Sequence, residues 1–498
     1  MIGAVRPDCH RWALILAVML VLTSAVVPAQ DLVVVRQPAA AVDPAAAEPA
    51  GRCADGSKII RLSADGAERL MSQGFFAACD PAVSFNGEQI LFAGKRSADD
   101  RLQVWRMAAS GGSVVRVSDD PGEATSPLWV GSLFHLDDVA PTQRIAYLAT
   151  GHGWADGRTG DPAAALYTSD VDGGNPLRIS YHLGTDITPD VLANGRLVFA
   201  AWRRGTGDGG DGRLSLMAVN NDGTDLMPFH DNHEGPPYPH SVRVGRDGRV
   251  YFVEANENSP LGGGDLAYVT LRRPLHSRTL LAAAGNGAYL DPLPRTDGRL
   301  LASFRPPGRG TVYSLYRIDA ATGERLELVH DTPGNHTLDA QELVPHPRVK
   351  GRSSVVDTAK ETGVFFCISS HLTDRPGLEH LKAGGASTLR VIEGVPAMSN
   401  STIQTSGSSE RTLGEAPIEN DGSFHIEVPS GVPLRFELLD DSGTTVARQD
   451  SWTWVMPREW RGCIGCHEDR EMVAPNTLAD AFVKPAVRLG RSEEVKKP

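Results

Sequence analysis

The sequence lacks a long hydrophobic run anywhere after Val27. Because a membrane-spanning helix needs about 20 consecutive apolar residues, we expect no transmembrane segment in the mature chain. Runs of Lys and Arg are also missing, and the formal net charge is -12. A surface that binds nucleic acid is therefore not expected. Cysteine is scarce, with six residues in 498, so the position of each one is informative.

The N-terminal segment has the pattern of a secretory signal. Arg6 and Arg11 precede the apolar run WALILAVMLVLTSAVV, and Val27-Pro28-Ala29 offers a cleavage site at its end. We expect residues 1–29 to be a signal peptide that is removed after Ala29, and the protein to be periplasmic or otherwise exported. A retained N-terminal anchor is the alternative, but the run is short for a membrane span.

Glycine (52) and proline (34) are spread along the chain rather than clustered, which favours an all-β fold of short strands joined by turns. A repeated unit supports this fold class. Its copies DPAVSFNGEQILFAGKR, TPDVLANGRLVFAAWRR, SVRVGRDGRVYFVEANE and DPLPRTDGRLLASFRPP begin at Asp80, Thr188, Ser241 and Asp291. Each copy reads as a short strand, a turn with glycine and a strongly apolar strand. The turn glycines are Gly87, Gly195, Gly248 and Gly298.

Hairpins of a second type, such as KIIRLSADGAERL and LSLMAVNNDGTDL, alternate with these units. Two hairpins per period of about 50 residues make a four-stranded blade, which is typical of a β-propeller. Inner hairpins near residues 80, 130, 188, 241, 291 and 343 predict six blades. KIIRLSADGAERL precedes every inner hairpin, so we expect it to complete the last blade and close the ring. The repeat resembles the TolB-like propeller units of periplasmic proteins.

After the repeats, strands split by Asn-Asp-Gly, Pro-Ser-Gly and Asp-Ser-Gly turns predict a small β-sandwich-like domain. The predicted organisation of the mature chain is an Ala/Pro linker at 30–51, the propeller at 52–395, a polar loop at 396–410, the haem c-binding domain at 411–488 and a disordered tail at 489–498.

The five cysteines of the mature chain fall into three groups. Cys53 and Cys79 are able to form one disulfide in an oxidising compartment, although the sequence leaves that pairing open. Cys367 lies in the apolar run TGVFFCISS and is expected to be a buried small hydrophobe. Cys463 and Cys466 stand in C-I-G-C-H, directly before His467.

C-x-x-C-H is the attachment sequence of c-type haem, in which two thiols form thioethers and the adjacent imidazole reaches the iron. We expect one covalent haem c on Cys463 and Cys466, with His467 as an axial iron ligand. Three other interpretations of the two cysteines are a Cys463–Cys466 disulfide, a zinc site with Glu468 or Asp469 nearby, and a redox C-x-x-C. The disulfide would need no histidine, the zinc site would want one or two further ligands at close spacing, and the thioredoxin-like context expected of a redox C-x-x-C is absent.

The segment GVPLRFELLDDSGTTVARQDSWTWVMPREWRGCIGCHEDREMVAPN, with ETGVFFCISS and LRVIEG upstream, resembles the middle-domain family of the hydrazine synthase alpha subunit. The resemblance implies a propeller followed by a haem-carrying domain in a multi-haem, multi-subunit complex. By matched position, it implies that Cys463 and Cys466 are the thioether cysteines and His467 the motif histidine. The chain has one C-x-x-C-H and ends soon after it, so we expect the second haem domain of that subunit to be absent.

The sixth iron ligand is open between Met456, Met472 and His425, of which His425 also reads as an ordinary outward-facing strand residue. Trp452 and Trp454 alternate on one strand and are read either as walls of the haem site or as core aromatics.

Six histidines fall in connections between blades and are expected to share one rim of the propeller. The stretch FHDNHEGPPYPH resembles a metal-binding loop through His230, His233 and His240, with Asp231 and Glu234 as oxygen ligands. A solvated polar loop is the alternative reading. The histidines are His182, His230, His233, His240, His330 and His336.

Three functions remain in view. The first is an exported monohaem c-type cytochrome that acts in electron transfer or as a haem subunit of a periplasmic redox complex, with a redox protein or other subunits as partners. The second is a TolB-like protein-binding propeller with a structural or sensory haem. The third is a haem enzyme that acts on small nitrogen compounds.

Overall fold

A computed structural model describes residues 30–39, 52–135, 138–157, 159–203, 213–230, 238–256, 262–308, 310–399, 408–466, 473 and 475–490. The described chain is almost entirely β-structure, with the short 3-10 helices η3 (Glu379–Ala383) and η4 (Asp480–Val483). The expected all-β class is confirmed. No helix in these ranges is long and apolar enough to cross a membrane. The predicted signal peptide, residues 1–29, lies outside the described part.

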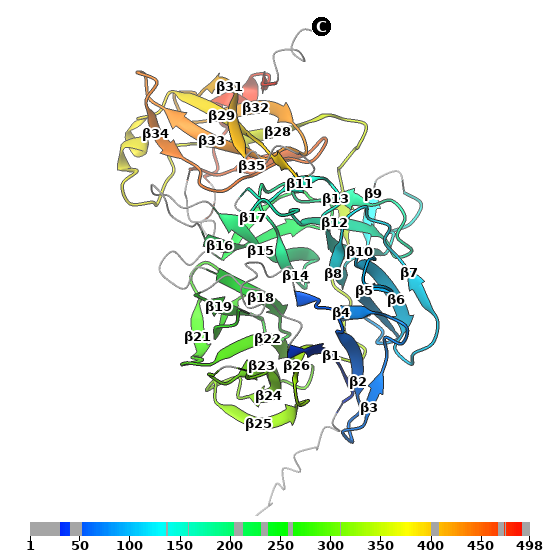
Figure 1. The fold of residues 1–498 in the computed structure, drawn as a ribbon. Coiled ribbons are helices and arrows are strands. Elements are labelled where there is room, and N and C mark those ends of the chain that lie inside the picture. Colours follow the sequence, from blue (N-terminus) through cyan, green and yellow to red (C-terminus); the bar gives the residue numbers. More distant parts are fainter. Residues whose placement is uncertain are drawn as a thin grey trace, which may run out of the picture.

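Six four-stranded antiparallel sheets form a ring of blades around a central channel, and the C-terminal domain sits at its edge (Figure 1). Five blades follow chain order. Blade 1 contains β4 (Ala77–Val83), β5 (Gln89–Lys95), β6 (Gln103–Ala108) and β7 (Val114–Arg116). Blade 2 contains β8 (Ala124–Trp129), β10 (Arg144–Ala149), β12 (Ala165–Asp170) and β13 (Leu177–Arg178). Blade 3 contains β14 (Ile187–Val191), β15 (Arg196–Arg203), β16 (Arg213–Asn220) and β17 (Met227–His230).

The fourth and fifth blades repeat this pattern. Blade 4 contains β18 (Tyr238–Val244), β19 (Arg249–Ala255), β20 (Asp265–Thr270) and β21 (Thr279–Ala282). Blade 5 contains β22 (Ala288–Pro294), β23 (Leu300–Arg305), β24 (Ser314–Ile318) and β25 (Arg325–His330). Apolar clusters lie between neighbouring blades, because each sheet must cover both of its faces.

Blade 6 joins the two ends of the propeller sequence. Its strand order is β26 (Asn335–Glu342), β1 (Leu32–Pro38), β2 (Lys58–Leu62) and β3 (Glu68–Leu70). The hairpin β2–β3 is KIIRLSADGAERL, so the predicted closure of the ring is confirmed, as is the count of six blades. The prediction of a linker over residues 30–51 is wrong for β1. The run LVVVRQP has the buried, β-branched character of an inner strand, which the Ala/Pro-rich stretch after it concealed.

The propeller ends earlier than residue 395. The sixth inner hairpin was expected in ELVPHPRVKGRSSVVD…TGVFFCISS, but β26 precedes that stretch and pairs with β1 instead. Residues 343–351 leave blade 6 and cross blades 1 and 3, where His346 N–H donates to Phe85 O (2.8 Å) and Lys350 N–H to Ala193 O (3.1 Å). β27 (Arg352–Ser354) then pairs in parallel with β9 (Leu133–His135).

The C-terminal domain is a sandwich of two four-stranded sheets. One contains β35 (Trp460–Cys463), β28 (Thr362–Cys367), β32 (Phe424–Pro429) and β36 (Val487–Arg488). The other contains β31 (Ser409–Pro417), β29 (Thr388–Val395), β33 (Leu434–Leu439) and β34 (Thr445–Arg448). A single apolar cluster that includes Phe365, Leu389 and Ile426 fills the space between them.

The predicted domain 411–488 is therefore too short. β28 and β29 were assigned to the propeller but supply a strand to each sheet of the sandwich. The polar loop 396–410 contains β30 (Ala397–Met398), which pairs with β11 (Trp154–Ala155) of the propeller side. Residues 400–407 and 491–498 lie outside the described ranges. Leu489, placed in the expected tail, is buried in the sandwich core.

Candidate functional site

Each inner strand carries one residue in the left-handed backbone region at the same position. These residues have φ between 45° and 52° and lie next to a β-bulge. Asp tolerates this conformation at modest cost, whereas a β-branched residue such as Thr188 is strained in it. The residues at this position are Asp80, Ser126, Thr188, Ser241, Asp291 and Asp339, and together they form the channel ring.

Four of the repeated sequence units begin at members of this ring. The repeat thus marks the positions that face the channel as well as the number of blades. The bulge turns the backbone N–H of one ring residue toward the side chain of the preceding blade. Ser126 N–H donates to Asp80 Oδ2 (2.9 Å), Ser241 N–H to Thr188 Oγ1 (3.0 Å) and Asp339 N–H to Asp291 Oδ2 (3.1 Å).

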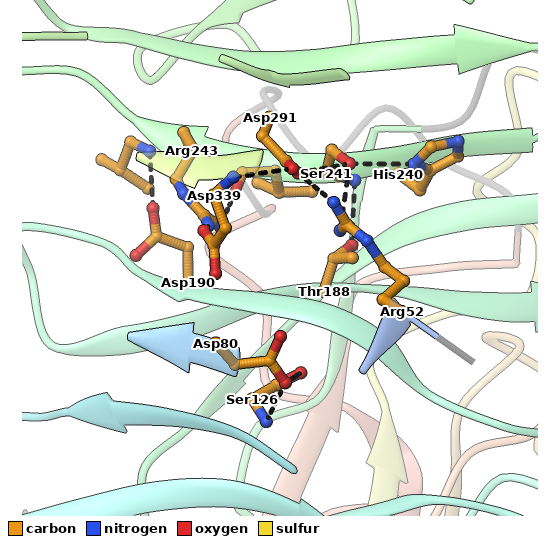
Figure 2. A network of polar contacts seen from close by, with 12 residues as sticks. Arg52, Asp80, Ser126, Thr188, Asp190, His240, Ser241, Arg243, Asp291 and Asp339 are labelled. Atoms are coloured by element: carbon orange, nitrogen blue, oxygen red, sulfur yellow. Dashed lines mark hydrogen bonds and ion pairs between the residues drawn. The ribbon is translucent and has the colours of Figure 1, made fainter. Parts of the chain in front are cut away.

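Two arginines enter this ring (Figure 2). Arg243 of β18 pairs with Asp339, and Arg52 pairs with Asp291 and donates to Ser241 Oγ (3.4 Å). Arg52 comes from the connection between β1 and β2, so it reaches the inner strands of blades 4 and 5 from a different part of the chain. No sequence signal identified Arg52, because its partners are more than 180 residues away.

Arg52 is followed by Cys53, and Cys79 precedes Asp80. Cys53 and Cys79 form a disulfide, which settles the pairing that the sequence left open. The bridge lies against an apolar cluster that includes Leu290, Tyr313 and Leu338. It therefore fixes the β1–β2 connection to blade 1 at the point where Arg52 enters the channel.

A cavity of about 490 Å³ lies in the channel, with Arg52, Asp80, Asp190, Arg243 and Asp339 among its lining residues. Burial raises the pKa of Asp80 and Asp190, and it raises that of Asp339 to about 6 against the opposing charge of Arg243. Burial also opposes ionisation of Asp291, but Arg52 and Arg243 outweigh it and lower that pKa. The charge of the channel therefore changes under mildly acidic conditions.

The second candidate site is the end of β35, where Cys463 is the last strand residue. Cys463 is in parallel register with Cys367 of β28, and Ile368 N–H donates to Cys463 O (3.0 Å). Cys466 N–H donates to Leu372 O (2.9 Å), which holds the turn after the strand. Both motif thiols are partly exposed and outside any disulfide, whereas Cys367 is fully buried as expected. His467 lies outside the described residues.

The two tryptophans before the motif have different surroundings. Trp454 is fully buried against the propeller, where its Nε1–H donates to Gly223 O (3.0 Å). Its ring stands edge-on to His182 at 4.9 Å between centroids. Trp452 lies under Arg435 at 5.4 Å. The reading of Trp454 as a wall of the haem site is wrong, because it packs between the domains.

The three candidates for the sixth iron ligand also differ in their surroundings. Met456 is 1% exposed in an apolar cluster of the propeller, and Met472 lies outside the described residues. His425 faces the outer side of its sheet, with Nδ1 3.3 Å from Lys484 O and its ring 5.5 Å from that of Trp460. A carbonyl partner fixes the proton on Nδ1.

The histidines expected on one rim are mostly buried, and each one that the structure describes has its own hydrogen-bond partner. His230 is 2% exposed with Nδ1 2.9 Å from Pro274 O, and His240 is 4% exposed with Nδ1 3.0 Å from Ser241 Oγ. Burial lowers the pKa of His240 to about 4. His233, Asp231 and Glu234 lie outside the described ranges. Within those ranges no group of three or more His, Cys, Asp or Glu side chains is arranged to hold a metal. The metal site at His230, His233 and His240 stays a prediction.

The remaining rim histidines have polar partners. His182 Nδ1 lies 2.9 Å from Asp186 Oδ1, His330 Nε2 lies 2.9 Å from Glu68 Oε1, and His336 Nδ1 accepts a hydrogen bond from Tyr313 N–H (3.0 Å).

Known proteins resemble this chain both in the sequence around the haem motif and in the overall fold. Residues 376–468 match the family model of the hydrazine synthase alpha subunit middle domain. The matched range contains Cys463, Cys466 and His467. This part of the chain is therefore similar to the middle domain of the hydrazine synthase alpha subunit.

The hydrazine synthase subunit alpha of Kuenenia stuttgartiensis is 23% identical over 512 residues, which cover 83% of this chain and 62% of that protein. The chain thus spans less than two thirds of its relative. The solved hydrazine synthase of the same organism has a TM-score of 0.79 at 19% identity, over 92% of this chain and 72% of that one. TolB from Acinetobacter baumannii gives a TM-score of 0.42 at 11% identity, over 62% and 66% of the two chains. The six-bladed assignment therefore rests on the sheet topology.

Proposed function

We propose that this protein is an exported, haem-carrying enzyme subunit that acts on small nitrogen compounds. One observation carries the proposal: the C-I-G-C-H motif falls inside the stretch that matches the hydrazine synthase alpha subunit middle domain. The name of the relative supplies the substrate class. The likeness in fold over most of the chain supports the same domain order in both proteins.

Cys463 and Cys466 fit covalent haem attachment. Their thiols are three residues apart on the end of a strand and the following turn, are partly exposed, and are not joined to each other. They would hold the haem through thioethers, with His467 as the axial ligand. When bound, the haem would supply a redox-active iron. The sandwich would keep the two thioether positions fixed through the bonds of Cys463 O and Cys466 N–H to neighbouring main chain.

Export and assembly belong to the same proposal. The Cys53–Cys79 disulfide supports an oxidising compartment, in agreement with the signal sequence. A single haem carries one electron, so chemistry on nitrogen compounds would need a redox partner or further subunits of a periplasmic complex. Pure electron transfer, the first reading of the sequence, has no separate support among the described residues and is an outcome of the test below.

The test begins with the full chain, including its signal, produced in a host that matures c-type cytochromes. We expect a haem-stained band on a denaturing gel and, in the reduced protein, a spectral change on adding carbon monoxide, hydroxylamine or hydrazine. Cys463→Ala with Cys466→Ala should abolish the stain. Cys367→Ala is the matched control, because it removes a thiol from the neighbouring strand without touching the motif, and it should keep the stain.

The outcomes separate the functions. A stain that survives the double substitution would refute covalent attachment at these cysteines. If the spectrum of the stained protein does not change with any of the three small molecules, both axial positions of the iron are filled. That result would overturn the enzyme proposal in favour of electron transfer. Binding of hydroxylamine or hydrazine together with its turnover in the presence of an electron carrier supports the proposal.

A further inference from the structure

The hairpin turn between β16 and β17 differs from its equivalents in the other blades. Its residues Asn220, Asn221, Asp222 and Thr224 are all less than 9% exposed. In the other five blades a polar residue at the tip of the corresponding turn is exposed, and these residues are Asp65, Ser110, Asp172, Arg272 and Thr322. A polar turn is normally solvated, so burial of this one requires partners for its main chain.

Those partners come from the segment that leads into the haem motif. Trp454 Nε1–H donates to Gly223 O (3.0 Å), and Asp225 N–H donates to Glu459 Oε1 (2.7 Å). Arg461 donates to Leu226 O. Three main-chain groups of the turn, at Gly223, Asp225 and Leu226, are thus satisfied by three side chains from residues 454–461.

Glu459 and Arg461 also bind their own segment. Glu459 Oε2 accepts from Met456 N–H (2.7 Å), and Arg461 Nη1 donates to Thr453 Oγ1 (2.6 Å) and Trp454 O (2.9 Å). The main chain of Glu459 accepts from Val364 N–H (2.8 Å) in β28. Each side chain therefore ties the turn, residues 453–456 and the start of β35 into one unit.

Cys463 lies four residues after Glu459 and two after Arg461 on this strand. A strand transmits a displacement along its length, since its residues share one ladder of hydrogen bonds. We propose that the β16–β17 turn of the propeller sets the position of the haem-attachment strand, with Glu459 and Arg461 as its positioning residues. This inference rests on the proposed function only for its haem readout.

Gly223 provides a way to test the contact from the propeller side. Its φ is +85°, and a Cβ there would lie 2.7 Å from Met456 Sδ, 3.0 Å from Met456 Cε and 3.1 Å from Ile179 Cα of the propeller. Gly66, in the corresponding turn of blade 6, has the same φ of +85° and nothing within 4 Å of a Cβ. Gly223→Ala and Gly66→Ala thus share the backbone cost of leaving glycine, but only Gly223→Ala pushes on the haem-attachment segment.

The experiment compares the two variants in the full chain. In haem-loaded protein, Gly223→Ala should shift the reduction potential and the absorption spectrum of the haem, and Gly66→Ala should leave both at wild-type values. In protein made without haem maturation, Gly223→Ala should speed alkylation of Cys463 and Cys466 on the order of fivefold, the factor that corresponds to about 1 kcal/mol. Glu459→Gln should act in the same direction, because its amide replaces one acceptor oxygen with a donor.

Equal alkylation rates and equal potentials in Gly223→Ala and Gly66→Ala would overturn the proposal. The alkylation measurement needs no haem, so it decides the positioning role even if the stain in the preceding test is absent. If Gly223→Ala fails to accumulate as folded protein, Glu459→Gln against the sandwich surface variant Glu415→Gln gives the same comparison. Glu415 pairs with Arg390 (2.8 Å) away from the propeller turn. A similar alkylation rate in these two variants would also refute it.

Discussion

The propeller and the C-terminal sandwich are both built from four-stranded sheets, but their strands are paired in different ways. In five blades the strands follow chain order, and only blade 6 takes in the distant strand β1. In the sandwich, β28 pairs with β35 from almost a hundred residues later. The propeller can therefore be recognised in the sequence as a repeat, whereas the strand pairing of the sandwich depends on contacts between distant segments. The following deletions and substitutions test this difference, and they are given from the largest expected effect on stability to the smallest.

The largest effect is expected from deleting β1, the one propeller strand that does not follow chain order. Removing Leu32–Pro38 leaves β26 and β2 without their common partner and opens the ring. Because a propeller blade is unable to bury its faces alone, we expect loss of the cooperative melt or aggregation. Deletion of β36 removes a two-residue pair at the edge of the sandwich and should leave the melt intact. A normal melt after loss of β1 would contradict the closure.

The disulfide comes next. Cys53–Cys79 closes a loop of 26 residues between the β1–β2 connection and blade 1. Loop-closure entropy then gives a loss of roughly 3 kcal/mol in the free energy of unfolding for Cys53→Ala with Cys79→Ala. Denaturant titration, followed through probes in each domain, measures it. The propeller transition should move and the sandwich transition should not, so a shift of both by the same amount would mean that the domains unfold as one unit.

Glu459 tests how the two regions are joined. Burial raises its pKa to about 7 against the favourable charge of Arg461, and Asp222 is the other charged group near it. The folded chain then binds a proton more tightly than the unfolded chain, whose Glu has its ordinary pKa near 4.5. The contribution of Glu459 to stability is therefore complete below about pH 4.5 and is lost as the pH rises through about 7, up to about 3 kcal/mol.

Urea titrations across this range would measure the slope. Glu459→Gln should flatten it relative to wild type, while the separate slope from Asp339 in the channel, whose pKa is about 6, remains. If the stability of Glu459→Gln changes with pH as steeply as that of wild type, Glu459 does not titrate at the domain contact.

The smallest effect belongs to a single link of the channel ring. Thr188→Val keeps the shape of the side chain but removes the acceptor of the buried Ser241 N–H. An unsatisfied buried donor costs about 1–3 kcal/mol, and we expect the lower part of this range because five other ring positions persist. Thermal unfolding of the propeller would show it. An increase in stability would mean that the Thr188 hydroxyl is not needed for blade packing.

Several features of the fold and site were predictable. The recurrence of Asp80, Thr188, Ser241 and Asp291 gave the blades their spacing, because each blade needs the same bulge and turn. The closing hairpin and the burial of Cys367 also followed from local pattern. The strand β1 was not predicted, because it is a single strand next to an Ala/Pro-rich stretch and lacks the hairpin turn by which the other strands are recognised. TGVFFC was placed in the wrong domain, since a buried strand has the same apolar pattern in either one.

The amino-acid sequence by itself determined the six-bladed ring, the position of the C-I-G-C-H motif and the segment that matches the hydrazine synthase alpha subunit middle domain. Repeats and covalent attachment motifs depend on residues close together in the chain, so local pattern is enough to find them. Only the tertiary structure decided that Arg52 enters the channel, that Trp454 packs on Gly223 and that Glu459 binds Asp225. Those contacts join residues about two hundred positions apart. Their energy comes from burial and hydrogen bonding that exist only once the blades and the sandwich have assembled.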